Sequence, residues 1–180
     1  MPAAEVLDFW FGTCSPEDWW RSSPELDRII AERFGETHRR LALGEGFSWR
    51  ASPEGRLAEI IVLDQFSRQL YRGDPRAFAQ DGMALALAQE AVAVGCDRAV
   101  PEDRRLFLYM PFMHSESLLV HEAALPLFVA LGGDNALKSA NEHLEVLRRF
   151  GRYPKRNAAL GRVSTPEELA YLAEIGDRMF

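Results

Sequence analysis

Hydrophobic residues recur along this chain at the spacing of three and four positions that one face of an α-helix requires. The clearest case runs from Leu26 to Leu41, and Ser23-Pro24 before it supplies a capping hydroxyl and a proline in the first turn. A second Ser-Pro pair opens residues 52–73 in the same way. No stretch alternates polar and apolar residues with the period of two that a strand requires. The pattern therefore predicts an all-α protein.

Start and stop signals divide the chain into about eight helices joined by short turns. We expect a helix over residues 3–11 that Gly12 stops, a turn over 13–20, and further helices over 24–41, 53–72, 77–94, 102–131, 135–150 and from 166 onward. The last follows a capping box, Thr165-Pro166-Glu167-Glu168, and Asp134 is expected to cap the one before it. Pro111 and Pro126 each remove a backbone donor, so they predict a break or kink in residues 102–131. Antiparallel helix hairpins follow from the short turns.

Length and composition describe one domain. At 180 residues and 47% hydrophobic content the chain suits a single domain, residues 1–180, with its own core. Its start resembles no secretory signal and no apolar run is long enough to span a bilayer, so we expect a cytoplasmic protein that avoids membranes. Cys14 and Cys96 have no metal or redox spacing and are predicted to be reduced packing residues. A pI near 5.3 argues against nucleic acid as a partner.

The charge is distributed unevenly. Residues 148–162 contain six basic residues and no acid, whereas the whole chain has a net charge of -6, so the remainder must sum to -12. The basic residues alternate with residues that turn or pack, Phe150, Gly151, Tyr153 and Pro154 among them. A solvated helix face usually mixes both signs. This stretch therefore suggests one wall of a polar site.

Polar residues elsewhere interrupt apolar sequence and need partners. Charges are rarely buried unpaired, because desolvation costs several kcal/mol per ion. Two interpretations remain open: the acids neutralise the arginines in a structural network, or the arginines outnumber the acids and leave a pocket for a carboxylate or phosphate. The candidate ligand-binding residues are Asp64, Gln65, Arg68, Arg72, Asp81, Glu116, Arg152, Arg156, Asn157 and Arg162.

His114 is the candidate catalytic acid or base, because imidazole exchanges a proton near neutral pH. On a continuous helix His114 and Glu116 would lie about 200° apart, so they would share a site only where Pro111 distorts the turn. No metal is expected, because the sequence around His114 is not a HExxH motif and His121 fits no zinc spacing. His38 and His143 fall on ordinary helical faces, as solvent-facing or packing residues. Nucleophile elbows and nucleotide loops are absent, and no cofactor is predicted.

Several long segments carry a resemblance to a known family. LDFWFG, LDQFSRQLYRGDPRAFAQD, FLYMPFMHSE and RFGRYPKRNAALGRVSTPEE resemble the signature segments of the bacterial domain-of-unknown-function family 924. The resemblance implies an all-α fold similar to tetratricopeptide-repeat helix hairpins, and it implies no activity. The motif residues coincide with the candidate set above. Two departures are Lys155, where the family often has histidine, and Ser117, Leu118 and His121 after the MHSE segment.

These observations support three functional hypotheses. The first is a tetratricopeptide-like helical protein whose arginine-rich pocket binds a small anionic ligand or an acidic peptide terminus. The second is an enzyme acting on a phosphorylated or carboxylated metabolite, with His114 as general acid or base. The third is a partner-binding scaffold in which the buried charges are structural and an apolar groove is exposed. The sequence leaves the oligomeric state open.

Overall fold

Helices make up most of the computed structural model, which describes residues 1–176 and, at Asp134, the backbone alone. No strand occurs within these residues, so the all-α prediction is confirmed. In chain order the elements are α1 (Ala3–Leu7), η1 (Asp8–Thr13), α2 (Pro16–Trp20), α3 (Pro24–Ala42), η2 (Phe47–Ala51), α4 (Pro53–Ile61), η3 (Val62–Phe66), α5 (Ser67–Leu70), η4 (Pro75–Phe78), α6 (Asp81–Ala93), η5 (Cys96–Arg98), α7 (Glu102–His114), α8 (Leu118–Leu131), α9 (Asp134–Phe150), η6 (Pro154–Arg156) and α10 (Pro166–Ile175).

Two of the short elements are π-helical turns that continue the helix before them. The turn η1 extends α1, and η3 joins α4 to α5, whereas η2, η4, η5 and η6 are 3₁₀ turns. Counted as continuous helical segments, the described residues contain nine, close to the eight predicted. The likeness to tetratricopeptide repeats stays a prediction.

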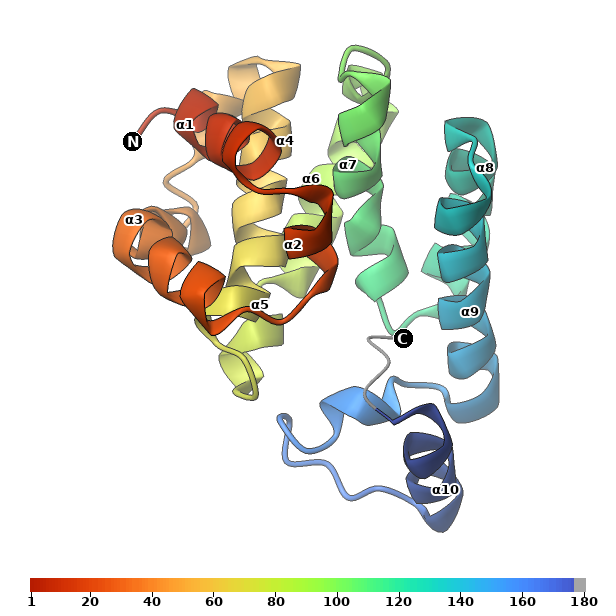
Figure 1. Ribbon diagram of the computed structural model, residues 1–180. Coiled ribbons are helices and arrows are strands. Elements are labelled where there is room, and N and C mark those ends of the chain that lie inside the picture. Colours follow the sequence, from red (N-terminus) through yellow and green to blue (C-terminus); the bar gives the residue numbers. More distant parts are fainter. Residues whose placement is uncertain (177–180) are drawn as a thin grey trace.

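The helices stand side by side in chain order (Figure 1). From α3 at one edge they follow through α4 and α7 to α8 and α9 at the other edge, while α1 lies across α4 and α10 lies below α9. The core at the centre is aromatic: Trp10, Phe66 and Phe107 are fully or almost fully buried, with ring centroids 5.5–5.7 Å from Trp10 to the other two. This packing fixes the long central helix that carries the first candidate residues.

The first twenty residues differ from the prediction. Gly12 does not stop the first helix, because the π turn η1 continues through it to Thr13. The expected turn over residues 13–20 contains α2, whose capping box joins Ser15 and Asp18. Trp19 packs partly buried against the core, but Trp20 is 43% exposed, so only one of these two tryptophans returns to the interior.

The two prolines in residues 102–131 behave differently. Four residues after Pro111 the chain leaves the helix, and Ser115 is extended (φ -68°, ψ 139°), so the predicted break separates α7 from α8. At Pro126 no break occurs, because α8 continues through it to Leu131, and the alternative of a kink stays a prediction. The angular argument that separated His114 from Glu116 no longer applies, since Glu116 lies in the extended connection.

Two other helix starts also differ. Asp74 accepts a hydrogen bond from the Arg76 amide as predicted, but it opens the 3₁₀ turn η4, and α6 begins only at Asp81. Asp134 is the first residue of α9, and Gly133 holds the cap position. By contrast, Ser23 and Ser52 cap α3 and α4 through their hydroxyl oxygens, as the Ser-Pro signals predicted.

The start of α4 packs too tightly for any side chain at Gly55. A Cβ placed there would lie 1.9 Å from the carbonyl oxygen of Trp49, a backbone atom that cannot rotate away. We expect Gly55→Ala to lower the free energy of unfolding by about 2–3 kcal/mol, as overpacking does. Gly35→Ala, inside α3 with open space around its Cβ position, should raise it by about 0.5–1 kcal/mol. Urea unfolding of both variants measures the contrast, and equal effects of one sign would contradict it.

Candidate functional site

The π turn η3 lies at the centre of the candidate site and carries Asp64 and Gln65. Both side chains are buried, Asp64 completely. The amide nitrogen of Gln65 donates to Asp64 Oδ2 at 2.5 Å and also lies 3.7 Å from the sulfur of Met110 on α7. A π turn is rare and recurs at functional sites, since its wider turn re-aims side chains. Here it points a carboxylate into the interface with α7.

His114, the last residue of α7, meets that carboxylate. Its Nδ1 lies 2.7 Å from Asp64 Oδ1. Asp64 is fully buried, and burial opposes its charge, but Arg68 and His114 outweigh burial and lower the pKa of Asp64. The ionised carboxylate can only accept, so Nδ1 carries the hydrogen and donates it. The geometry thus selects one tautomer of His114.

That tautomer leaves the other ring nitrogen as an acceptor. No group in the described part of the chain hydrogen-bonds to His114 Nε2. This nitrogen is not fully buried, so it reaches solvent. The side chain as a whole is 12% exposed. Burial, and then the positive charge of Arg68, lower the pKa of His114, which is therefore neutral at pH 7. An oriented, neutral imidazole with one open nitrogen is suited to accept a proton.

Two arginines flank the pair and share one acid. Arg68 contacts Asp64 Oδ1 at 3.2 Å and Asp81 Oδ1 at 3.1 Å, and Arg156 reaches Asp81 Oδ2 at 3.0 Å. A second nitrogen of Arg156 donates to the backbone carbonyl of His114 at 2.9 Å. Its guanidinium lies between the rings of Phe78 and Tyr153, 4.7 and 4.9 Å from their centroids. The structure therefore brings the polar end of the central helix, α6 and η6 together around His114.

Glu116 and Arg162 form a neighbouring pair. Arg162 grips the carboxylate with two nitrogens at 2.7 and 2.9 Å, and the amide of Tyr153 donates to the same carboxylate at 2.7 Å. Burial opposes the charge of Glu116, but Arg162 and this amide outweigh it and lower its pKa. The pair lies beside the His114 cluster and closes the segment that carries Arg156 against the end of α7.

Arg152 and Asn157 belong to a third group that lies farther out. Arg152 makes a bidentate pair with Glu168 at 2.7 and 2.8 Å, and the Asn157 amide donates to the same carboxylate at 3.2 Å. Glu168 also completes the capping box of α10 by accepting from the Thr165 amide. These contacts hold residues 152–168 to one another. Neither side chain has a contact with the Asp64–His114 pair.

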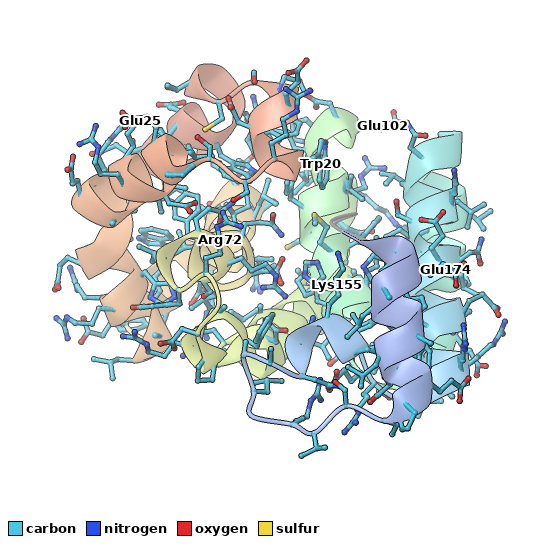
Figure 2. All side chains as sticks on the ribbon, turned by 60° about the horizontal axis from the view of Figure 1, so that its bottom comes forward. Trp20, Glu25, Arg72, Glu102, Lys155 and Glu174 are labelled. Atoms are coloured by element: carbon cyan, nitrogen blue, oxygen red, sulfur yellow. The ribbon has the colours of Figure 1, made fainter. Side chains whose placement is uncertain are left out.

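Arg72 lies apart from all three groups. It pairs with Asp27 on α3 at 2.8 and 2.9 Å. The helix ends at Leu70 and Tyr71 leaves it (φ -130°), so Arg72 does not continue the face of Asp64 and Arg68. The prediction that Arg72 lies with Asp64 and Arg68 assumed a regular helix of 100° per residue, and it was wrong for this reason. Figure 2 shows Arg72 on the side of the central helix, in the same half of the molecule as α3.

The arginines of the candidate set do not outnumber their acids. Each contacts a carboxylate: Asp64 and Asp81 for Arg68, Asp81 for Arg156, Glu116 for Arg162, Glu168 for Arg152 and Asp27 for Arg72. Sequence reasoning missed Glu168 and Tyr153 as partners. Glu168 was visible only as a capping residue, and Tyr153 contributes through its backbone amide to Glu116 and through its ring to Arg156. The argument from an excess of arginine therefore has no local basis.

Two hollows lie away from His114. One, too small to hold a water molecule, is lined by Lys155, Pro154 and residues of α9 and α10; the other, of about 90 Å³, lies between α3 and η2. Neither contains a member of the candidate set. We place the candidate site at His114 because a buried carboxylate orients its imidazole there and two arginines flank the pair.

The sequence matches a family model described as a bacterial protein of unknown function (DUF924) over residues 6–176. The chain belongs to this family. A solved structure of a protein of unknown function from Agrobacterium tumefaciens is 40% identical to this chain and superimposes with a TM-score of 0.91. That comparison covers 96% of this chain and 97% of the other. The comparison with curated proteins found no match.

The other histidines and the cysteines of this DUF924 protein are buried or partly buried. His143 and His38 are buried, and His38 contacts the Ser67 hydroxyl at 2.7 Å. Cys14 and Cys96 are unbridged. Within residues 1–176 no His, Cys, Asp and Glu cluster could hold a metal ion. Over the same residues, no helix combines the length and the apolar character needed to cross a bilayer.

Proposed function

We propose that this DUF924 protein is an enzyme acting on a small polar metabolite, with His114 as the proton acceptor. The observation that supports it is the 2.7 Å contact between Asp64 and His114 Nδ1, together with the open Nε2. A hydroxyl group or a neutral amine of the ligand would give its proton to Nε2. The resulting imidazolium would be stabilised by the buried carboxylate of Asp64, which already orients the ring. His114 is the catalytic residue in this proposal and Asp64 positions it.

Arg68 and Arg156 favour a ligand that also carries a carboxylate or phosphate. Both guanidiniums contact Asp81, Arg68 also contacts Asp64, and their side chains remain 21% and 13% exposed. An anionic group could share the outward N–H donors while Asp81 stays in place. The ligand class is therefore a carboxylated or phosphorylated metabolite, or an acidic peptide terminus. Because acids balance the arginines of the cluster, we assign the arginines the role of orienting the ligand. The proton acceptor, His114, is the feature that distinguishes an enzyme from an anion-binding protein.

A second candidate is binding of such an anion without chemistry. The stacked position of Arg156 between Phe78 and Tyr153 favours it, because a rigid guanidinium loses little entropy on binding. Complete pairing of the arginines is also what a purely structural network requires. The open nitrogen of His114 argues against a purely structural network, because such a network needs no acceptor that faces solvent.

A thermal-shift screen tests these alternatives. Carboxylated and phosphorylated metabolites and acidic peptides are added to wild type, His114→Asn and Arg156→Lys. Asparagine keeps an N–H donor for Asp64 but removes the outward nitrogen. A ligand at 100 times its Kd adds about 2.7 kcal/mol of stability, which is about 5–10 °C in Tm for a chain of this size.

The proposal expects a hit whose turnover is lost in His114→Asn while some binding persists. Arg148→Lys, at an exposed position on α9, is the matched control and should behave as wild type. A hit that depends on Arg156 but shows no turnover, and is bound equally by His114→Asn, would indicate binding alone. Ligand responses that survive both substitutions would remove this site from consideration.

A further inference from the structure

The outward face of α8 is apolar, although α8 stands at the edge of the row of helices. It packs against α7 and α9, and Figure 1 shows it at the edge opposite α3. Of its 14 residues, LLVHEAALPLFVAL, only Glu122 is charged. Phe128 and Ala124 fill the inward side, whereas Leu119 and Val129 are 76% and 62% exposed. A helix that is hydrophobic all round is normally buried, so the outward face of α8 is suited to a further partner.

The exposed apolar positions of α8 form one continuous stripe. At 100° per residue, four of them fall within about 60° of one another around the helix axis. These four are called here the α8 stripe: Leu119, Ala123, Pro126 and Ala130. Glu122 and Val129 lie along one flank of it. Contiguous apolar patches of this kind on a protein surface mark interaction sites.

The neighbouring helix α9 shows how this chain builds a face that meets solvent. Each described position of α9 that is exposed carries a polar side chain. Lys138 pairs with Glu142 and Arg148 with Glu145 along that face. Since α8 and α9 share the same edge of the molecule, the edge position alone does not account for the apolar residues of the α8 stripe.

The α8 stripe is complementary in shape to a second copy of itself. Two copies of α8 that pack antiparallel about a two-fold axis place each residue of one opposite a fixed residue of the other, and every such contact occurs twice. With the axis level with the Ala124–Leu125 bond, Leu119 faces Ala130 of the second copy and Ala123 faces Pro126. Each larger side chain then meets an alanine, so the two helices can approach closely.

The charges beside the α8 stripe fit the same arrangement. Glu122 lies 4.0 Å from Arg148 of α9, which pairs more closely with Glu145, at 2.6 Å. Glu122 therefore marks the α9 side of the stripe. The two-fold axis brings both α9 helices to one side of the pair, so each Glu122 faces the side that carries Arg148 of the second copy. An apolar centre with complementary charges at its rim is the usual anatomy of a protein interface.

We propose that the α8 stripe is the contact surface of a homodimer, in which two copies of α8 pack antiparallel about a two-fold axis. The partner is a second copy of this chain. The stripe is about 17 Å long, and one such helix pair buries less than the roughly 800 Å² per partner of a standard stable interface. The dimer therefore forms and dissociates with concentration. No residue of the candidate site takes part, so the inference stands apart from the proposed function.

Sedimentation velocity of the full chain from about 1 to about 200 µM measures this association. The mass of the wild type should rise with concentration from one chain, 20.3 kDa, toward two. Leu119→Glu should weaken association at least about tenfold, because two carboxylates would lose water against apolar surface. Leu43→Glu is the matched control: Leu43 is 66% exposed at the end of α3, on the opposite edge, and this variant should associate as the wild type does. Circular dichroism should be the same for all three proteins.

A mixture of two charge variants tests the two-fold arrangement. Glu122→Arg and Arg148→Glu each place like charges opposite one another across the pair, so each alone should associate about threefold more weakly than wild type. In an equimolar mixture opposite charges meet at both ends of the interface, and the strength of association should return to that of the wild type.

Three results would overturn the proposal. A wild type that stays one chain over the whole concentration range would exclude the second copy as the partner. Association that Leu119→Glu does not weaken, or that Leu43→Glu weakens as much, would place the contact elsewhere on the molecule. A mixture of Glu122→Arg and Arg148→Glu that associates no more strongly than either variant alone would contradict the antiparallel arrangement.

Discussion

Asp64→Ala should lower the free energy of unfolding by about 3–5 kcal/mol, because it leaves the positive charge of Arg68 buried without its fully buried partner. The substitution also removes the acceptor of His114 Nδ1 and of the Gln65 amide, so two more polar groups lose a hydrogen bond. Urea unfolding followed by circular dichroism measures the change, with the midpoint shifting and the m-value constant.

The matched control is Asp27→Ala. Asp27 also pairs with an arginine in a bidentate geometry, but Arg72 is 44% exposed, so its charge keeps its hydration when the partner is removed. We expect a loss of about 1 kcal/mol or less. Equal unfolding midpoints for the two variants would contradict a buried, charge-balanced network around Asp64.

Acidification should destabilise the protein well before its carboxylates titrate, because its histidines are buried in the neutral form. Burial, and then the charge of His114, lower the pKa of His143 from 6.5 to about 3. Burial also lowers the pKa of His38, His114 and His121. The unfolded chain therefore binds more protons than the folded one below pH 6.5. Stability is complete above that pH and falls as the pH drops toward the folded pKa values.

His143 alone should contribute about 3–5 kcal/mol over the window from pH 6.5 to about 3, at about 1.4 kcal/mol per pH unit. Among the described residues, the charges of His114, His121 and Arg156 lower this pKa, and the Ser139 carbonyl beside His143 Nδ1 partly offsets them. Urea unfolding at pH 7.5, 6.5, 5.5 and 4.5 measures the slope. His143→Gln should flatten it by about one proton, and an unchanged slope would rule out this assignment.

The carboxylates act in a lower window. The pKa of Asp64 and that of Glu116 lie below their ordinary values, so the stability from these groups is present above the unfolded pKa, about 4, and is lost as the pH falls further. A measurement between pH 4.5 and 6.5 therefore reports the histidines. The two windows separate the imidazoles of the site region from its acids.

Local signals explain why most of the fold could be predicted. Three helices begin with a capping side-chain oxygen and a following proline, at Ser23, Ser52 and Thr165. The capping contact spans no more than four residues, so the sequence alone predicts it. The π turns were not predicted, because the composition of residues 62–66 does not distinguish a π turn from an α turn. Pro126 does not break α8, although it removes one backbone donor from the helix.

Part of the candidate site could also be predicted, for a different reason. Buried charges must pair, so Asp64, Arg68, Asp81 and Arg156 could be grouped before their positions were known. The grouping failed for Arg72, because it assumed a regular α-helix, whereas the helix ends at Leu70 and Tyr71 turns the chain away. The balance between arginines and acids was not predicted either. Glu168 pairs with Arg152 and Asp27 pairs with Arg72, and these partners are too far apart in the sequence for a local pattern to link them.

The π turn between α4 and α5 has a consequence for the phase of the helix that contains it. A π turn holds one residue more than an α turn, so the segments before and after residues 62–66 are offset by about 100° relative to a continuous α-helix. Loss of a single residue from this turn would restore regular winding and rotate Ser67 and Arg68 by that angle. Ser67 would leave His38, and Arg68 would leave Asp81. Deletion of one residue at this turn should therefore take apart the contacts of Arg68 with Asp64 and Asp81, although the helix itself would survive it.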